Sequence, residues 1–115
     1  VAVRRSIRWV PGPASEPTDT LVLTGGKSGV FLDIRFLKNT SKVDWAFAGY
    51  RHQLPDGRVQ FKHHIDSRTL DPLSVKDIGA NTVLEGGKTL EVGEMINPDT
   101  GLMTSYEEVW EDKHL

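Results

Sequence analysis

Residues 30–37 read VFLDIRFL, and this stretch decides the class of fold. Its even-numbered positions are all apolar, and its odd-numbered positions place Asp33 and Arg35 between two further apolar residues. A period of two residues is typical of a β-strand, because successive side chains of a strand point to opposite faces. The alternation therefore predicts a half-buried antiparallel strand and not a helix.

The same period of two recurs along the chain, and turn residues separate the repeats. Residues 59–66, 90–96 and 106–111 alternate in this way, and Pro55-Asp56-Gly57 has the composition of a hairpin turn. No long window carries the apolar stripe of an amphipathic helix. The runs between turn signals predict eight strands, at residues 5–10, 20–24, 29–38, 42–50, 58–66, 76–84, 88–96 and 103–112.

Eight sequential antiparallel strands predict an all-β fold, a single eight-stranded up-and-down antiparallel barrel of the lipocalin or calycin type. We expect one domain over residues 1–115. A two-sheet sandwich is the alternative, but Greek-key crossings need longer loops than most of the links offer. The proline-rich residues 11–19 are expected to form an ordered lead-in or a strap across the barrel mouth.

Composition narrows the class of partner and the compartment. The 14 basic and 16 acidic residues give a net charge of −2, without the basic excess of a nucleic-acid-binding protein. The absence of cysteine excludes disulfides, thiolate catalysis and thiolate metal sites, and it favours a cytoplasmic location. No apolar run approaches the ~20 residues that cross a bilayer, and residues 1–13 hold three arginines where a signal peptide would need a longer apolar core.

Three polar residues interrupt apolar strand faces and are the candidates for catalysis. His63 follows Val59 and Phe61 on one face of its strand, and Glu94 and Glu108 lie on apolar faces of two later strands. A buried His–Glu pair could pass a proton, because burial raises the pKa of a carboxyl group. The alternative is that His63 is a hydrogen-bonded structural residue and that one or both glutamates lie near a barrel mouth.

The aromatic residues predict a pocket for an apolar or aromatic small molecule. Such a pocket would be lined by Trp45, Phe61, Tyr106 and Trp110 and would suit a flat ligand with one or two polar groups. Arg35 is a candidate clamp for a ligand carboxylate, with a surface or mouth salt bridge as the alternative.

We expect neither a metal nor a cofactor. His63 and His64 are adjacent in a strand, so they point to opposite faces and cannot bind one ion together. His64 and Asp66 share a face and could supply two ligands, but no further histidine completes a set of three or four.

Several segments resemble the Hri protein family of fungi. The resemblance rests on the segments Val43-Asp44-Trp45-Ala46-Phe47-Ala48-Gly49, His64-Ile65-Asp66-Ser67-Arg68 and Tyr106-Glu107-Glu108-Val109-Trp110, and on the runs at residues 19–24 and 31–35. It implies a lipocalin-like barrel, the first of two in the longer yeast member, whose name refers to a casein-kinase-type partner. It implies no enzyme activity and therefore assigns no catalytic residue.

Three hypotheses of function follow. The first is a barrel that binds a small molecule, and the second is a protein-interaction module with a filled core, which an exposed apolar patch would favour. The third is a cofactor-free isomerase, cyclase or dehydratase that uses His63 with Glu94 or Glu108; whether the protein is an enzyme stays open. A homodimer formed through an outer face is a further possibility.

Overall fold

The computed structural model describes residues 1–113 and consists almost entirely of strands. The strands are β1 (Ala2–Trp9), β2 (Ala14–Ser15), β3 (Thr18–Thr24), β4 (Val30–Leu37), β5 (Val43–Gln53), β6 (Val59–Asp66), β7 (Ile78–Val83), β8 (Lys88–Ile96) and β9 (Met103–Asp112). Two single helical turns, η1 (Pro72–Ser74) and η2 (Glu85–Gly87), lie in loops. No helix within residues 1–113 is long and apolar enough to cross a membrane.

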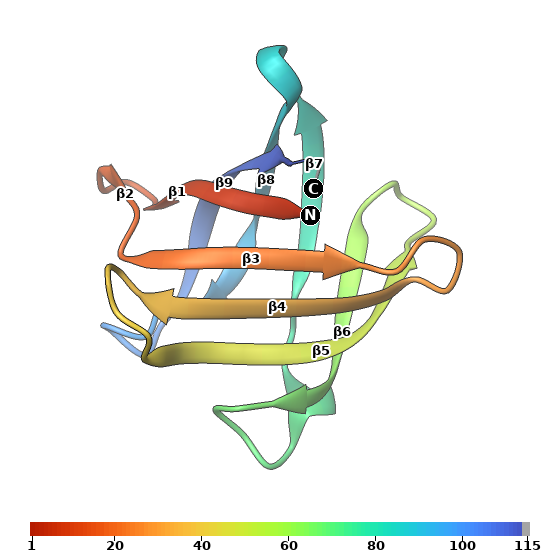
Figure 1. Cartoon of the computed structure of the whole chain (residues 1–115), viewed down its shortest axis with the longest axis horizontal. Helices are drawn as coiled ribbons and strands as arrows, with labels where there is room; N and C mark the ends of the chain where they lie inside the picture. Colours follow the sequence, from red (N-terminus) through yellow and green to blue (C-terminus); the bar gives the residue numbers. More distant parts are fainter. Residues whose placement is uncertain (114–115) are drawn as a thin grey trace.

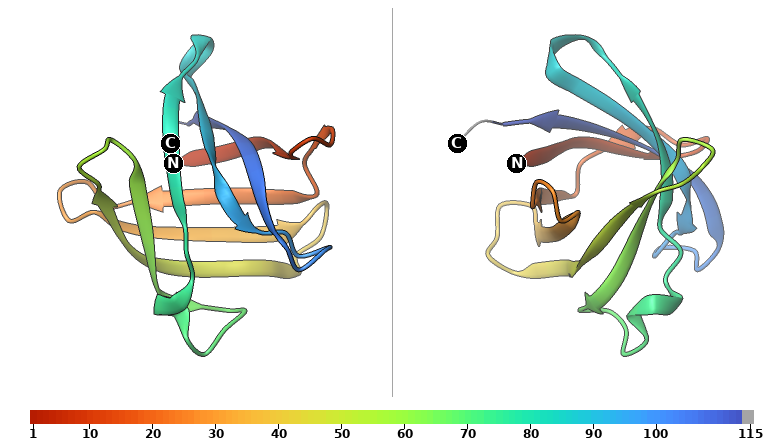
Figure 2. Two further views of the ribbon diagram at one scale, coloured as in Figure 1. Left: turned by 180° about the vertical axis from the view of Figure 1, so that it is seen from behind. Right: turned by 90° about the vertical axis from the view of Figure 1, so that its right-hand side faces the viewer.

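The strands form a closed antiparallel barrel, as the sequence predicts (Figure 1). Each strand from β3 to β9 pairs with the next, and β9 pairs with β1 to complete the circle. Figure 2 shows the first and last strands side by side in both further views. Every predicted strand is present, with ends that differ by a few residues.

The short strand β2 is the one addition to the eight-stranded barrel. It lies in the proline-rich segment 11–19 and pairs with the end of β1, where Ile7 faces Ser15 and Arg8 faces Ala14. This segment therefore folds back along β1 before the chain enters β3.

Two neighbouring strand pairs are joined by only a few backbone contacts. β1 pairs with β3 at two positions, and β6 pairs with β7 at two positions, whereas β8 and β9 pair along nine residues. We call these two places the β1/β3 seam and the β6/β7 seam. Few backbone hydrogen bonds join the strands at these seams, so side-chain contacts contribute a larger share of the connection there.

A β-bulge in β6 changes which of its side chains face the interior. Gly49 of β5 is paired with His63, but Ala48 is paired with Ile65, so one extra residue is inserted between them. Beyond the bulge the alternation changes phase. Ile65, which the sequence pattern places on the same face as His63, is therefore 72% exposed, and Asp66 is buried instead.

The apolar part of the interior is small and aromatic. Phe31, Trp45 and Phe47 form its centre, and Phe61 and Met95 pack against them. The Phe31 ring meets the Phe47 and Phe61 rings edge-on, with centroids 5.9 and 5.2 Å apart, an arrangement that aromatic pairs favour. The rest of the interior is polar, and this polar part carries the candidate site.

Candidate functional site

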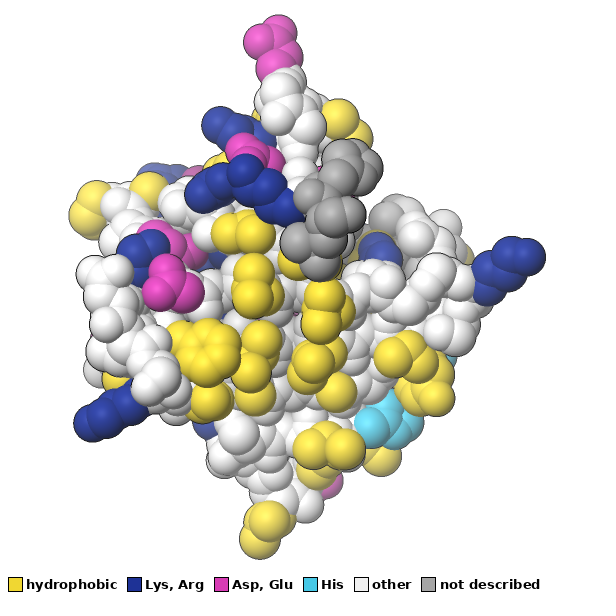
Figure 3. Space-filling model, viewed as in Figure 1, with side chains coloured by type: hydrophobic (Ala, Val, Ile, Leu, Met, Phe, Trp, Pro, Cys, Tyr) yellow, Lys and Arg dark blue, Asp and Glu magenta, His cyan; other side chains and the backbone are white. Residues whose placement is uncertain are grey.

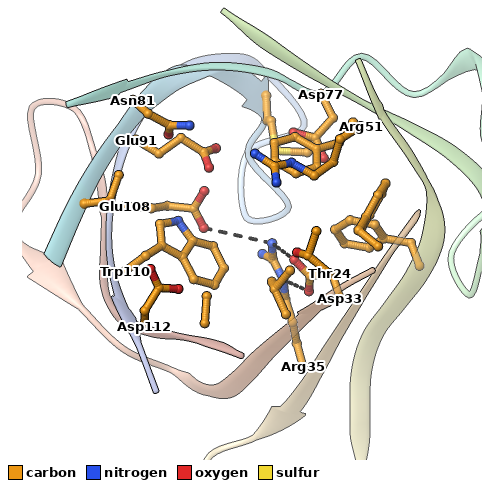
Figure 4. A pocket seen from close by; sticks show the side chains of 17 residues that line it. Thr24, Asp33, Arg35, Arg51, Asp77, Asn81, Glu91, Glu108, Trp110 and Asp112 are labelled. Carbon is orange, nitrogen blue, oxygen red and sulfur yellow. Dashed lines mark hydrogen bonds and ion pairs between the residues drawn. The ribbon is translucent and has the colours of Figure 1, made fainter. Parts of the chain in front are cut away.

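The barrel encloses a cavity of about 230 Å³ that opens at one end (Figure 4). Its wall is formed in part by the aromatic residues Phe31, Phe47, Phe61 and Trp110. Seven charged residues complete much of the rest, namely Asp33, Arg35, Arg51, Asp77, Glu91, Glu108 and Asp112. The predicted apolar, tryptophan-rich pocket is wrong in this respect, because the strand faces that carry Asp33, Arg35 and Glu108 point inward.

Glu108 is confirmed as a buried residue of the barrel interior and is held by arginine. Its Oε2 atom accepts a hydrogen bond of 2.9 Å from Nη1 of Arg4 and lies 3.9 Å from Nη2 of Arg35. Two guanidinium groups thus lie against one carboxylate. Glu108 therefore serves as an anionic link between β9, β1 and β4.

Glu91 lies directly opposite Glu108 in the β8–β9 pair, but it is bound by a tyrosine and not by arginines. The hydroxyl of Tyr106 donates a hydrogen bond of 2.7 Å to Oε2 of Glu91. Burial, the charge of Glu108 and the charge of Asp77 together raise the pKa of Glu91 well above its usual value. One strand pair thus holds a carboxyl group bound by arginine and another whose protonated form is favoured by burial and by the neighbouring carboxylates.

Arg4 closes the β1/β3 seam. Its guanidinium binds both carboxylate oxygens of Glu16 at 2.9 Å and donates to the hydroxyl of Thr18 at 3.0 Å, in addition to its bond with Glu108. The Arg4 side chain is almost completely buried, so these four hydrogen bonds replace the water that it loses.

Arg35 lies on β4, which is separated from β1 by β3, and it is also held by a carboxylate. It binds Asp33 through two hydrogen bonds of 2.9 and 3.1 Å, and its guanidinium lies 4.8 Å from the centre of the Trp45 ring. Burial opposes its charge, but Asp33 and Glu108 outweigh that effect and raise the pKa of Arg35. Arg35 therefore forms an ion pair inside the barrel and not at its surface.

His63 closes the β6/β7 seam and does not line the cavity. The ring is fully buried, and its two nitrogens lie 2.8 Å from Oδ2 of Asp66 and 2.7 Å from Oδ2 of Asp77. Burial alone would lower the pKa of His63, but the hydrogen bonds to Asp77 and Asp66 outweigh it and raise that pKa. The ring also stacks on Phe47 with centroids 4.0 Å apart.

These contacts do not support the predicted catalytic pairing of His63 with a glutamate. Both ring nitrogens are engaged by aspartates, and Glu108 is bound by arginines instead. The alternative, a hydrogen-bonded structural histidine, describes what the structure shows.

Glu94 is exposed, so its predicted place in the interior is wrong. The reason is the phase of β8: Glu91 and Gly93 lie opposite Glu108 and Tyr106, whose side chains are buried, while Val92 and Ile96 are exposed. Val92 and Ile96 therefore face outward, and Met95 is the apolar residue of β8 that packs against the aromatic core. Its acidic residue on the inner face could have been found only by aligning β8 with β9.

The predicted ligand-binding residues are divided between two hollows. Phe61, Trp110 and Arg35 line the larger cavity. Trp45 and Tyr106, again with Arg35, line a hollow of about 100 Å³ at the other end of the barrel. The structure thus brings these residues into the barrel but not into one pocket.

One charged residue of the larger cavity, Arg51, is not among the residues predicted from the sequence. Arg51 follows the buried part of β5 and is exposed, and its guanidinium lies over the Phe61 ring at 5.7 Å at the cavity wall. Nε1 of Trp110 is buried and has no hydrogen-bond partner in the described part of the chain. Within residues 1–113, no group of three or more side chains is arranged to hold a metal ion.

Comparisons with known proteins give one result. The model of a protein family described as Protein HRI1 matches residues 1–115. A search of curated proteins finds no match.

Proposed function

The chain belongs to the HRI1 protein family, and on this premise we propose that its barrel binds a small molecule in the larger cavity, in the manner of a lipocalin. The observation that carries the proposal is the cavity itself, a space of about 230 Å³ inside a closed barrel. A concave space lined by aromatic rings and a few charged groups is the usual form of a small-molecule site, and this lining supports an occupant.

The size and wall of the cavity restrict the occupant. Pockets for drug-sized ligands measure about 300–1,000 Å³, and this cavity is smaller. Aromatic rings can cover the apolar part of a ligand, while Arg51 and the carboxyl groups can bind its polar part. A small ligand with both kinds of surface fits better than the purely apolar one that composition suggests.

A ligand screen with paired variants tests the proposal. Asn81 lines the cavity and the next residue, Thr82, does not, so Asn81→Trp narrows the opening and Thr82→Trp is its control. We expect calorimetry or ligand-observed NMR with a library of small polar fragments to find compounds that bind the protein. Their binding should be lost in Asn81→Trp and retained in Thr82→Trp. Absence of any binding fragment, or binding that Asn81→Trp leaves intact, contradicts the proposal.

Self-association is a second candidate function, and an apolar outer face favours it. Across β3, β4, β5 and β6 the register places apolar residues next to each other in two rows, Leu23–Leu32–Ala48–Ile65 and Leu21–Ile34–Ala46. Figure 3 shows apolar side chains gathered over these strands. We call this surface the β3–β5 face.

The occupant that we propose for the β3–β5 face is a second copy of the chain. Leu23, Leu32 and Ile65 of this face are 45%, 38% and 72% exposed. A contiguous exposed apolar surface of this kind is typical of an interaction site. Its two rows contain no charged residue, so two copies can pack face to face about a two-fold axis without burying a charge.

Sedimentation tests this second candidate. Leu32 lies within the face, and Leu102 is an equally apolar, 66% exposed residue in the turn between β8 and β9. The wild-type protein and Leu102→Lys should sediment as dimers at micromolar concentration, and Leu32→Lys as a monomer. A monomeric wild-type protein at all concentrations refutes it without affecting the ligand proposal.

A further inference from the structure

Arg51 differs from every other arginine of the protein in its ion pairing. Within residues 1–113, each of the other six arginines forms a salt bridge with a carboxylate, namely Arg4, Arg5, Arg8, Arg35, Arg58 and Arg68. Arg51 forms none in that part of the chain; its guanidinium instead lies over Phe61 and lines the cavity. Its planar set of donors is therefore available to an anionic group in the cavity.

Three acidic residues of the cavity wall are also bound by basic side chains. Asp33 is bound by Arg35, Asp77 by His63 and Glu108 by Arg4. Asp112 also lines the cavity, and it has no cationic partner within residues 1–113. Glu91 accepts a hydrogen bond from the Tyr106 hydroxyl, so the cation Arg51 and the carboxylate Asp112 are the charged groups of the wall that have no such partner within residues 1–113.

These two unpaired groups lie on opposite walls. In the closed order of eight strands, three strands separate β5, which carries Arg51, from β9, which carries Asp112, in either direction around the barrel. Figure 4 accordingly shows Arg51 across the cavity from Asp112. The two residues do not neutralise each other, and a ligand between them can contact both.

We propose that the cavity binds a small zwitterion, an aminocarboxylate of the size of a free amino acid. This inference rests on the proposed ligand-binding function and names the class of ligand. The carboxylate accepts paired hydrogen bonds from the Arg51 guanidinium, and the ammonium group donates to Asp112. The carbon chain between them lies against the aromatic rings of Phe61 and Trp110, which line the same cavity.

Charge balance of the interior supports this choice over an anion alone. The neighbouring Glu91 carboxyl can accept a further hydrogen bond from an ammonium group, whereas a second anionic group would lie next to Glu91, Glu108 and Asp112. A purely cationic ligand would leave Arg51 without a partner. A zwitterion provides a partner for both Arg51 and Asp112.

The test compares charged and monofunctional ligands of equal length. Calorimetric titrations would use the unbranched ω-aminocarboxylates from glycine to 6-aminohexanoate, with the matching alkylamines and alkanoates. One chain length should bind best, and its amine and its alkanoate should each bind about tenfold more weakly, as expected for loss of a charge-assisted hydrogen bond. Equal binding of the zwitterion and either analogue overturns the inference.

Variants assign the two ends of the ligand. Arg51→Gln should weaken binding of the best aminocarboxylate about tenfold and leave binding of the matching amine unchanged. Asp112→Asn should also weaken binding of the aminocarboxylate about tenfold, but it should leave binding of the matching alkanoate unchanged. Arg58→Gln and Glu85→Gln are the controls, because both residues are exposed and lie outside the cavity wall. If neutral fragments bind and are lost in Asn81→Trp while no aminocarboxylate responds to Arg51→Gln, the ligand class is wrong and the binding function stands.

Discussion

At the scale of single residues, ionisable side chains occupy positions where sequence patterns lead one to expect apolar packing. His63 is held between two aspartates, and Glu91 lies beside Tyr106 and Glu108. Buried charges are retained only when they are paired and hydrogen-bonded, and removal of one partner leaves the other uncompensated. Each of these residues therefore has a measurable effect on stability.

Replacement of His63 by glutamine should destabilise the fold strongly. The substitution leaves the buried Asp66 and Asp77 carboxylates without the imidazole that both bind, for which we expect a loss of about 3–5 kcal/mol in the free energy of unfolding, measured by urea denaturation. His52, an exposed histidine at the end of β5, provides the control, and His52→Gln should change the free energy by less than about 0.5 kcal/mol. Equal effects of the two substitutions would show that His63 does not link the seam.

The raised pKa of His63 also makes the stability of the folded protein depend on pH. A histidine whose pKa is raised by folding stabilises the folded state fully below its unfolded pKa of about 6.5. This stabilisation is lost as the pH rises through the higher pKa of the folded state. The destabilisation caused by His63→Gln should therefore be largest below pH 6.5 and become smaller at alkaline pH.

Replacement of Glu91 by glutamine should stabilise the folded protein relative to the wild type, by an amount that grows as the pH rises. The pKa of Glu91 is raised by folding, so the unfolded chain loses its proton first, from about pH 4.5 upward, and wild-type stability falls by up to about 1.4 kcal/mol per pH unit. Glutamine resembles the neutral acid and can still accept the hydrogen bond from Tyr106. Urea denaturation from pH 4 to pH 8 should show a difference between variant and wild type that grows with pH; a constant difference argues against a protonated Glu91.

At the scale of secondary-structure elements, the bulge in β6 determines which residues enter the interior. The inserted residue brings the backbone of Lys62 so close to Gly49 of β5 that a side-chain carbon at Gly49 would overlap the Lys62 carbonyl oxygen. Glycine is therefore required there for steric reasons, and the bulge places His63 and Asp66 on the same side of the sheet.

Substitution of alanine for Gly49 tests this arrangement. We expect Gly49→Ala to lower the free energy of unfolding by more than about 2 kcal/mol, because the strands must separate locally to admit the new methyl group. Gly26→Ala, in the open turn before β4, should have an effect within about 0.5 kcal/mol. If both proteins unfold at the same urea concentration, the close approach of β5 and β6 is not needed for the fold.

At the scale of the whole molecule, the barrel is closed by two different means. The pairs β3–β4, β4–β5, β5–β6 and β8–β9 are joined by long hydrogen-bonded ladders. The β1/β3 and β6/β7 seams instead depend on Arg4 with its carboxylates and on His63 with its aspartates. Short ladders leave more backbone amides without a strong partner, so opening should start at the seams.

Hydrogen exchange measures this difference directly. Amides of β4 and β9, which pair with both neighbours along most of their length, should exchange slowest, and those of β7 that face β6 beyond its two paired residues should exchange much faster. In Arg4→Met, exchange should increase first in β1 and β3. Uniform protection around the barrel would contradict a molecule closed by side chains at two seams.

The eight barrel strands and their sequential pairing follow from the sequence alone, whereas β2 and the closure of the barrel in place of a sandwich are seen in the structure. Alternation and turn residues are local signals, because side-chain direction in a strand depends only on position, and short turns join neighbouring strands. Glu108 and Phe61 could be assigned to the interior for the same reason, since their strand segments keep an uninterrupted phase.

The composition of the site was decided by the tertiary structure. Both faces of β4 and β8 carry apolar residues, so the local pattern cannot choose between Glu91 and Glu94, and only register with β9 places Glu91 inside. The bulge that turns Ile65 outward depends on how β5 and β6 pair, which the alternation does not show. The position of Arg51 opposite Asp112 depends on strands far apart in sequence. Local sequence fixes which residues alternate, whereas burial of a charge depends on the partner that the closed barrel brings to it.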